Sequence, residues 1–227
     1  MTWPDLYNIQ TAKEVKPVPS RPTIRQIDHA DDPPGAADLD RRSAIVRALH
    51  RCVRERGYAR TSLTDIAVRA GMSPSHIRYY FDGKDAILRH YFEALCVDLL
   101  AEIKKIEMTS PEQWLHDLSR FYVGNPRISQ AGLSVIVEIF GFAMHDIAMK
   151  EIKTRFDEEM HAIWRGFFEQ AGCADGLTPD IAATLVRAMD IGLKYGSAFC
   201  KTESGRLEGI FIAGVNCILP RPRMRQA

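Results

Sequence analysis

Apolar residues recur along this chain at intervals that predict helices. From Leu39 onward, Ile45, Leu49 and Val53 follow one another every four residues until Gly57 ends the segment. There is no hairpin signal and no run of alternating apolar and polar residues. The later helix-length segments are bounded by Gly, Pro or Asn and span roughly residues 84–107, 111–124, 128–145, 147–171, 178–201 and 205–219. The chain is therefore expected to be all-α.

The two ends of the chain lack this periodicity. Residues 1–38 hold six of the twelve prolines, which predicts a flexible arm, and residues 220–227 predict a frayed basic tail. No stretch approaches the length of about 18 uninterrupted apolar residues that a membrane span needs. The first residues also lack the basic and apolar regions of a signal peptide. We therefore expect a cytoplasmic protein with no membrane partner.

Residues 61–73 carry the signals of a short helix followed by a tight turn. Ser62 or Thr61 can cap the helix, with Asp65 as the capping-box partner of Ser62. Gly71 can take the left-handed conformation that ends such a helix, and Ser73 can cap the next one. The buried stripe of the first helix is expected to consist of Leu63, Ile66, Ala67 and Ala70.

The second helix is predicted to start at Pro74, where a missing N–H costs nothing, and to bury Ile77 and Phe81. Its outer side is left to Ser75, His76, Arg78 and Tyr79, with Tyr80 at the edge. Two short helices joined by a Gly-containing turn match a helix-turn-helix whose second helix enters the DNA major groove. A helical hairpin that only packs is the structural alternative.

The charge distribution supports a polyanion as the partner of this region. The net charge of the chain is +1, but residues 41–90 contain eleven Lys/Arg against four Asp/Glu, so this segment carries +7 and the rest carries −6. Asp82 and Asp85 look like a further capping pair, which places Lys84 in the first turn of the next helix. A lysine there opposes the helix dipole unless an anion is present, and a DNA phosphate would be such an anion.

These residues resemble the TetR family of transcriptional regulators. The stretch GYARTSLTDIAVRAGMSPSHIRYYFDGKDAILRHYFEAL follows the family pattern of Gly-Tyr, a Thr/Ser pair, Ile-Ala, Ala-Gly-hydrophobic-Ser, Tyr-Phe and Lys-Asp/Glu-x-Leu. The resemblance implies a DNA-binding head at residues 39–84 and a helical body at residues 85–219 that binds an effector and dimerises. By matching position, Thr61, Ser73, Tyr80 and Lys84 would contact phosphates, while Pro74, Ser75 and His76 would lie nearest the base edges. The full predicted DNA-binding set also includes Ser62, Arg78 and Tyr79.

Arg78 departs from the family pattern, which usually has a tyrosine at this position. Arginine can take over a phosphate contact, or it can reach a guanine through paired donors, which is worth about 1–3 kcal/mol of discrimination. We favour the phosphate contact. If Arg78→Ala loses the same affinity for specific and for random DNA, Arg78 contacts a phosphate.

The segment ISQAGLSVIVEIFGFAMHD is similar to the body of BetI-like family members. Glu138 and His145 lie on one side of this expected helix and can anchor the polar group of a ligand inside an apolar pocket. The alternative is that they mark a solvated helix face and that the aromatics are ordinary core. The predicted pocket consists of Trp114, Phe121, Tyr122, Glu138, Phe142, His145 and Trp164.

The last two expected helices carry broad apolar stripes interrupted by small residues. Two such helices from each subunit can form a four-helix interface, and a helix-turn-helix protein needs a dimer to reach two half-sites. Core packing within one subunit is the alternative. The predicted interface consists of Leu185, Ala188, Gly192, Tyr195, Gly196, Phe199, Phe211, Gly214, Val215 and Ile218.

The favoured hypothesis is a non-enzymatic homodimeric repressor that a small-molecule effector releases from a palindromic double-stranded DNA operator. No cofactor or metal is expected, because the five cysteines are widely spaced and form no CxxC or Cys/His pattern. One alternative is a metal-dependent phosphohydrolase of the HD type, suggested by His116-Asp117 and His145-Asp146, with His90 and His161 as further ligands. The other is a DNA-binding protein without an effector.

Overall fold

The computed structural model describes residues 41–123, 130–199 and 204–220, and these residues form helices and no strands. The predicted arm at residues 1–38 and most of the predicted basic tail lie outside the described residues. The helices are α2 (Arg41–Arg56), α3 (Leu63–Ala70), α4 (Pro74–Tyr80), α5 (Gly83–Ile103), α6 (Pro111–Tyr122), α7 (Gln130–Ala143), α8 (Ile147–Ala171), α9 (Pro179–Phe199) and α10 (Ser204–Ile218). The all-α prediction is confirmed.

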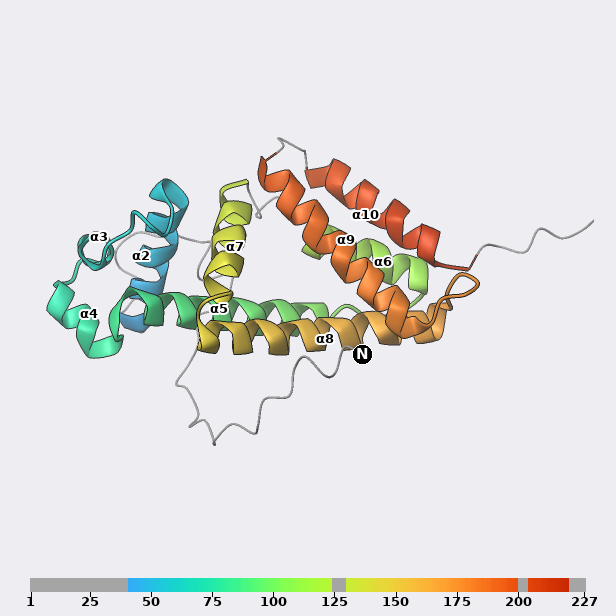
Figure 1. Cartoon of the computed structure of the whole chain (residues 1–227), viewed down its shortest axis with the longest axis horizontal. Coiled ribbons are helices and arrows are strands. Elements are labelled where there is room, and N and C mark those ends of the chain that lie inside the picture. Colours follow the sequence, from blue (N-terminus) through green and yellow to red (C-terminus); the bar gives the residue numbers. More distant parts are fainter. Residues whose placement is uncertain (1–40, 124–129, 200–203, 221–227) are drawn as a thin grey trace, which may run out of the picture.

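The molecule is elongated, with a small head at one end (Figure 1). Helices α2, α3 and α4 form this head, and α5 runs from it along α8 into the body. At the other end, α9 crosses α8 and packs against α10, and α6 lies against both α8 and α10. Helix α7 stands between head and body, in contact with α2, α8 and α9. The position of α7 makes it the direct link between the two parts.

Two clusters of buried side chains hold the fold together. The first fills the head with Ile45, Leu49, Ile66 and Ile77, all fully buried, and continues into α5 and α7. The second fills the body around Trp164, and its rings meet in stacked or edge-to-face arrangements. Each fully buried side chain of this kind contributes about 1.5–3 kcal/mol of transfer free energy. Phe156 of α8 packs against both clusters, so the two cores are not independent.

Candidate nucleic-acid interface and buried cavity

The local signals of the helix-turn-helix are all present in the structure. Ser62 caps α3 in a capping box: its hydroxyl accepts from the backbone N–H of Asp65 at 3.1 Å, and its own N–H donates to the Asp65 carboxylate at 2.9 Å. Gly71 has φ of +66° and ends α3 in the left-handed conformation, where a side chain would be strained. Ser73 caps α4, accepting from the N–H of His76 at 3.1 Å, with Pro74 next to it. Ser62, and not Thr61, is thus the cap.

Helix α4 buries one side and exposes the other as the sequence predicts. Ile77 is fully buried in the head core, whereas Ser75, His76, Arg78 and Tyr79 are exposed. The Tyr79 side chain is 82% exposed, and its ring meets that of Tyr80 edge to face at 5.1 Å. The outer side of α4 therefore presents polar, basic and aromatic side chains to solvent.

Two other arginines of the head are paired with acids, whereas Arg78 is not. Arg69 pairs with Glu55 through two contacts of 2.5 and 2.6 Å, and Arg56 pairs with Asp65 at 2.8 Å. The Arg69 guanidinium lowers the pKa of the Glu55 carboxyl, chiefly through this hydrogen bond. Among the residues that the structure describes, Arg78 makes no ion pair. Its charge therefore remains available to a polyanion on the outer face of α4.

Thr61 faces inward and its hydroxyl has a partner inside the protein, which does not favour the predicted phosphate contact. The residue is only 2% exposed, and its hydroxyl donates to the Gly57 carbonyl at 2.8 Å. The bond closes the turn between α2 and α3. Sequence matching alone missed this, because the same residue type serves equally well for a phosphate or for a buried turn.

Lys84 has partners inside the protein that the sequence did not indicate. Its ammonium group donates to the carbonyls of Tyr58 at 3.0 Å and Thr61 at 2.8 Å, and it lies 4.1 Å from the centre of the Tyr58 ring. The predicted Asp82–Asp85 capping pair is wrong: Asp82 makes no side-chain cap, and Asp85 accepts from the Tyr58 hydroxyl. An ammonium has three N–H donors, and the two carbonyls take two of them.

Tyr58 is the residue that sequence reasoning missed. Its backbone N–H donates to the Glu138 carboxylate of α7, and its ring meets Phe142 of the same helix edge to face at 5.6 Å. Burial, and then the hydrogen bond to Asp85, raise the pKa of the Tyr58 phenol. The preceding Gly57 has φ of +80°, and a Cβ there would lie 3.0 Å from Glu138 Oε1. Body and head therefore meet at this turn.

The described residues of the predicted ligand pocket do not gather around one cavity, and a ligand site there stays a prediction. Glu138 and Phe142 form the contact with the head, and His145 is exposed beyond the end of α7. Trp114 stacks on Phe167 at 4.9 Å in the body core, and Phe121 packs against the same cluster. The side chain of Tyr122 lies outside the described residues. Among the described residues of the predicted set, Trp164 is the one that lines the cavity between α5, α7, α8 and α9.

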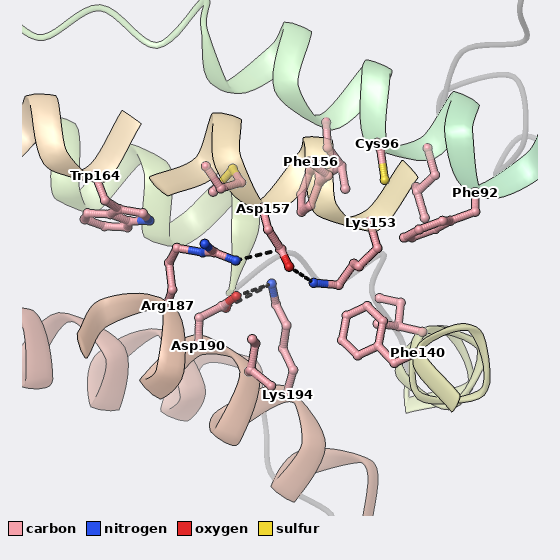
Figure 2. Close-up of a pocket in the computed structure, with 15 residues that line it drawn as sticks. Phe92, Cys96, Phe140, Lys153, Phe156, Asp157, Trp164, Arg187, Asp190 and Lys194 are labelled. Atoms are coloured by element: carbon pink, nitrogen blue, oxygen red, sulfur yellow. Dashed lines mark hydrogen bonds and ion pairs between the residues drawn. The ribbon is translucent and has the colours of Figure 1, made fainter. Parts of the chain in front are cut away.

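A cavity of about 70 Å³ lies between α5, α7, α8 and α9. Figure 2 shows charged side chains pointing into it from α8 and α9, with aromatic rings around them. Its apolar lining consists of Phe92, Leu95, Cys96, Leu99, Ile136, Phe140, Phe156, Met160, Trp164 and Ile191, and its charged lining of Lys153, Asp157, Arg187, Asp190 and Lys194. Cys96 is buried against the cavity, and this burial raises the pKa of its thiol to about 12. A sequence signal for the site exists: Asp190 continues the buried stripe of Ala183 and Val186 at helical spacing.

The predicted dimer residues divide between surface and core. On α9, Leu185 and Tyr195 are 44% and 56% exposed, and Ala188, Gly192 and Gly196 are also exposed. On α10, Phe211 and Val215 are fully buried within the protomer and are therefore unavailable to a second copy. Gly214 lies against Met189, and Ile218 packs on the body core. The side chain of Phe199 lies outside the described residues.

The histidines proposed for a metal-dependent hydrolase lie apart. His161 bonds to Asp180 at 2.8 Å, His90 packs on the Phe81 ring, and His116 is exposed on α6. Asp146 caps α8 and pairs with Arg89 at 2.7 Å. Within the described ranges, no three His, Cys, Asp or Glu residues are grouped so as to hold a metal ion. The hydrolase hypothesis gains no support from this arrangement.

Within the same described ranges, no helix has the length and apolar character needed to cross a membrane.

Known proteins share the sequence pattern of the head and the fold of most of the chain. Residues 45–91 match the family of bacterial regulatory proteins described as tetR. The chain is 24% identical over 134 residues to the HTH-type transcriptional regulator BetI of Ectopseudomonas mendocina, which covers 57% of this chain and 68% of that protein.

Solved structures extend the likeness beyond the head. A TetR transcription regulator from Haloarcula marismortui has a TM-score of 0.71 and 20% identity, covering 79% of this chain and 98% of that chain. A putative transcriptional regulator from Saccharomonospora viridis, solved in complex with choline, has a TM-score of 0.66 at 20% identity, with coverage of 79% and 98%. At these identities the likeness shows the fold.

Proposed function

We infer that the chain belongs to the TetR family of bacterial regulatory proteins. On this premise, we propose that it is a repressor that binds a palindromic DNA operator as a dimer. An effector bound in the body would release it from the operator. The observation that carries the DNA-binding part is the outer face of α4. There Ser75, His76, Arg78 and Tyr79 are exposed on the most basic segment of the chain, above a buried Ile77. Polar and basic groups on the second helix of a helix-turn-helix are suited to base edges and phosphates.

The effector-responsive part rests on the two faces of α7. Ile136 and Phe140 of this helix line the cavity, whereas Glu138 and Phe142 contact Tyr58 of the head. Residues two apart on a helix point about 200° apart, so the two pairs lie on opposite sides of the same rigid element. A molecule that displaces Phe140 would therefore also move the turn that holds α2 and α3. The molecule changes the DNA affinity only to the extent that it binds one position of α7 more tightly than the other.

The dimer rests on the exposed apolar stripe of α9. Ile181, Leu185, Ala188, Gly192 and Tyr195 follow one another at helical spacing and are all exposed in the single chain. An apolar stripe of this kind is typical of a helix that pairs with another helix. The structure of the Saccharomonospora viridis neighbour with choline supports a small-molecule effector for this fold. It does not identify the effector of this chain.

Paired arginine variants test the DNA-binding part. The affinity of the purified protein for a fluorescent mixed-sequence duplex is measured by anisotropy over a range of salt concentrations. Arg78→Ala should weaken binding by about tenfold and flatten the salt dependence, because a phosphate contact is lost. Arg165→Ala, on the exposed side of α8, makes the same change in net charge far from the head and should leave the affinity unchanged.

Equal weakening by both arginine variants would show that only net charge matters. That result would show that α4 is not part of the DNA interface. Binding that is unaffected by either variant would also contradict the proposal.

A further inference from the structure

Five charged side chains enter the body cavity, and the other ten residues that line it are apolar. Lys153, Lys194 and Asp190 are among the most buried of the five, with side-chain exposures of 18%, 13% and 11%. Removing charges from water costs several kcal/mol per ion unless each is paired. The ion pairs among these five side chains therefore determine whether the cavity favours an anionic, a neutral or a cationic ligand.

The charged lining of the cavity contains one more cationic than anionic side chain. The Lys194 ammonium donates to Asp190 Oδ2 at 3.0 Å and lies 2.9 Å from Oδ1 of the same carboxylate. Asp157 is shared, since Arg187 approaches it at 2.8 Å from α9 and Lys153 bonds to it along α8. Three cationic and two anionic groups line the cavity, so the net charge of the lining is +1.

The two lysines point toward each other across the cavity (Figure 2), from α8 and α9. Burial lowers the pKa of the Lys194 ammonium, and the charge of Lys153 lowers it further, although the Asp190 carboxylate opposes both effects. The Lys153 ammonium also lies 4.7 Å from the centre of the Phe140 ring. An anion between the two ammonium groups would remove their repulsion without breaking either aspartate pair.

We propose that this cavity binds a small organic monoanion, a carboxylate on an apolar body, with the carboxylate between Lys153 and Lys194 and the body against Phe92, Phe140, Phe156 and Trp164. The regulatory consequence of such binding rests on the proposed function. A monoanion neutralises the lining, whereas a cation raises its charge to +2 and a dianion reverses it to −1. The two ammonium groups favour the carboxylate over the uncharged amide of the same shape.

The size of the cavity limits the ligand and links it to α7. An apolar cavity of about 150 Å³ is known to bind benzene. The present cavity of about 70 Å³ is about half that size, so a ligand body as large as one ring has to push the walls outward. Ile136 and Phe140 form the wall on α7, the helix that holds the Tyr58 turn of the head.

Lys153→Met is the variant that tests the surplus charge. It brings the lining to neutrality while Asp157 keeps Arg187 and Asp190 keeps Lys194. Calorimetry on the full chain compares hexanoate, octanoate and phenylacetate with their primary amides and with hexylamine. At least one carboxylate should bind the wild type tenfold or more tighter than its amide, and hexylamine should bind weakest. In Lys153→Met this preference should fall at least tenfold, with amide affinity changed less than twofold.

Lys105→Met serves as the matched control, because Lys105 is exposed and pairs with Glu102 away from the cavity. It should retain the carboxylate preference. Lys194→Met, tested beside it, should lose the preference as well. No carboxylate preference in the wild type, or a preference that survives in folded Lys153→Met, overturns the proposal.

A parallel DNA measurement separates this inference from the proposed function. If carboxylates bind in the expected pattern but DNA affinity does not change, the ligand class stands and the ligand-responsive function fails. If an uncharged or cationic molecule releases DNA while no carboxylate binds, the function stands and the ligand class is overturned.

Discussion

Thr61 and Lys84 both close the turn between α2 and α3 from within the protein. The Thr61 hydroxyl donates to Gly57, and the Lys84 ammonium donates to Tyr58 and Thr61. Hydrogen bonds of this kind contribute about 1 kcal/mol each, and about 1.5–3 kcal/mol when a charged group takes part. The position of the helix-turn-helix relative to α5 therefore depends on these two side chains.

Thr61→Val tests the role of Thr61 as a turn residue. The substitution keeps the shape of the side chain and removes the hydroxyl, so it should lower the free energy of unfolding by about 1 kcal/mol. Urea denaturation measures this loss. Thr64→Val makes the same change at an exposed position of α3 and should cost less. A Thr61→Val protein with full stability but weakened DNA affinity would restore the phosphate contact.

The residues that sequence reasoning placed correctly are those whose partners lie nearby in the chain. Ser62, Gly71 and Ser73 act within three or four residues, so capping rules suffice for them. Glu138 bonds to Tyr58, which is 80 residues away, and no local rule connects the two. The charged cavity was missed because the Arg187–Asp157 pair and the packing of four helices bring its side chains together, although Lys153–Asp157 and Asp190–Lys194 are each four residues apart on one helix.

Helix α7 is the element through which cavity and head are proposed to communicate. Phe140 lines the cavity, and Phe142, two residues later, meets the Tyr58 ring at the head. The two rings are the same chemical group on opposite faces of one helix. The same substitution to alanine at each position therefore tests the two faces of α7 one at a time.

Phe142→Ala should change DNA affinity more than the binding of carboxylates, because it removes the ring that meets Tyr58 of the head and that does not line the cavity. Phe140→Ala should change carboxylate binding while DNA affinity in the absence of ligand stays within about twofold. Anisotropy and calorimetry measure the two affinities for each variant. Identical effects of both substitutions on both affinities would indicate general destabilisation of α7, and would count against a two-faced link.

At the scale of the whole molecule, the outer stripe of α9 is the proposed dimer surface. Leu185→Glu places a charge in the middle of this stripe and should shift the protein from dimer to monomer at micromolar concentration, as measured by sedimentation. Ile147→Glu changes a side chain that is 77% exposed at the start of α8, and it should leave the dimer intact. A wild-type protein that sediments as a monomer would contradict the dimer directly.

The proposed dimer would also determine the form of the DNA site. Two recognition helices related by two-fold symmetry read two half-sites about 34–36 Å apart, one turn of the double helix. A monomeric head would read a single half-site with no fixed partner. The spacing of the bound sequence therefore reports on the head and the dimer together.

The most direct test of the account is selection of bound duplexes from a random-sequence library by the purified dimer, followed by sequencing. The account predicts an inverted repeat with half-sites one turn apart, lost in His76→Ala and retained in His116→Ala, which changes an exposed histidine of α6. On the selected duplex, an Arg78→Ala loss equal to that on random DNA identifies a phosphate contact. Failure of the folded dimer to enrich any sequence at moderate salt would contradict the account.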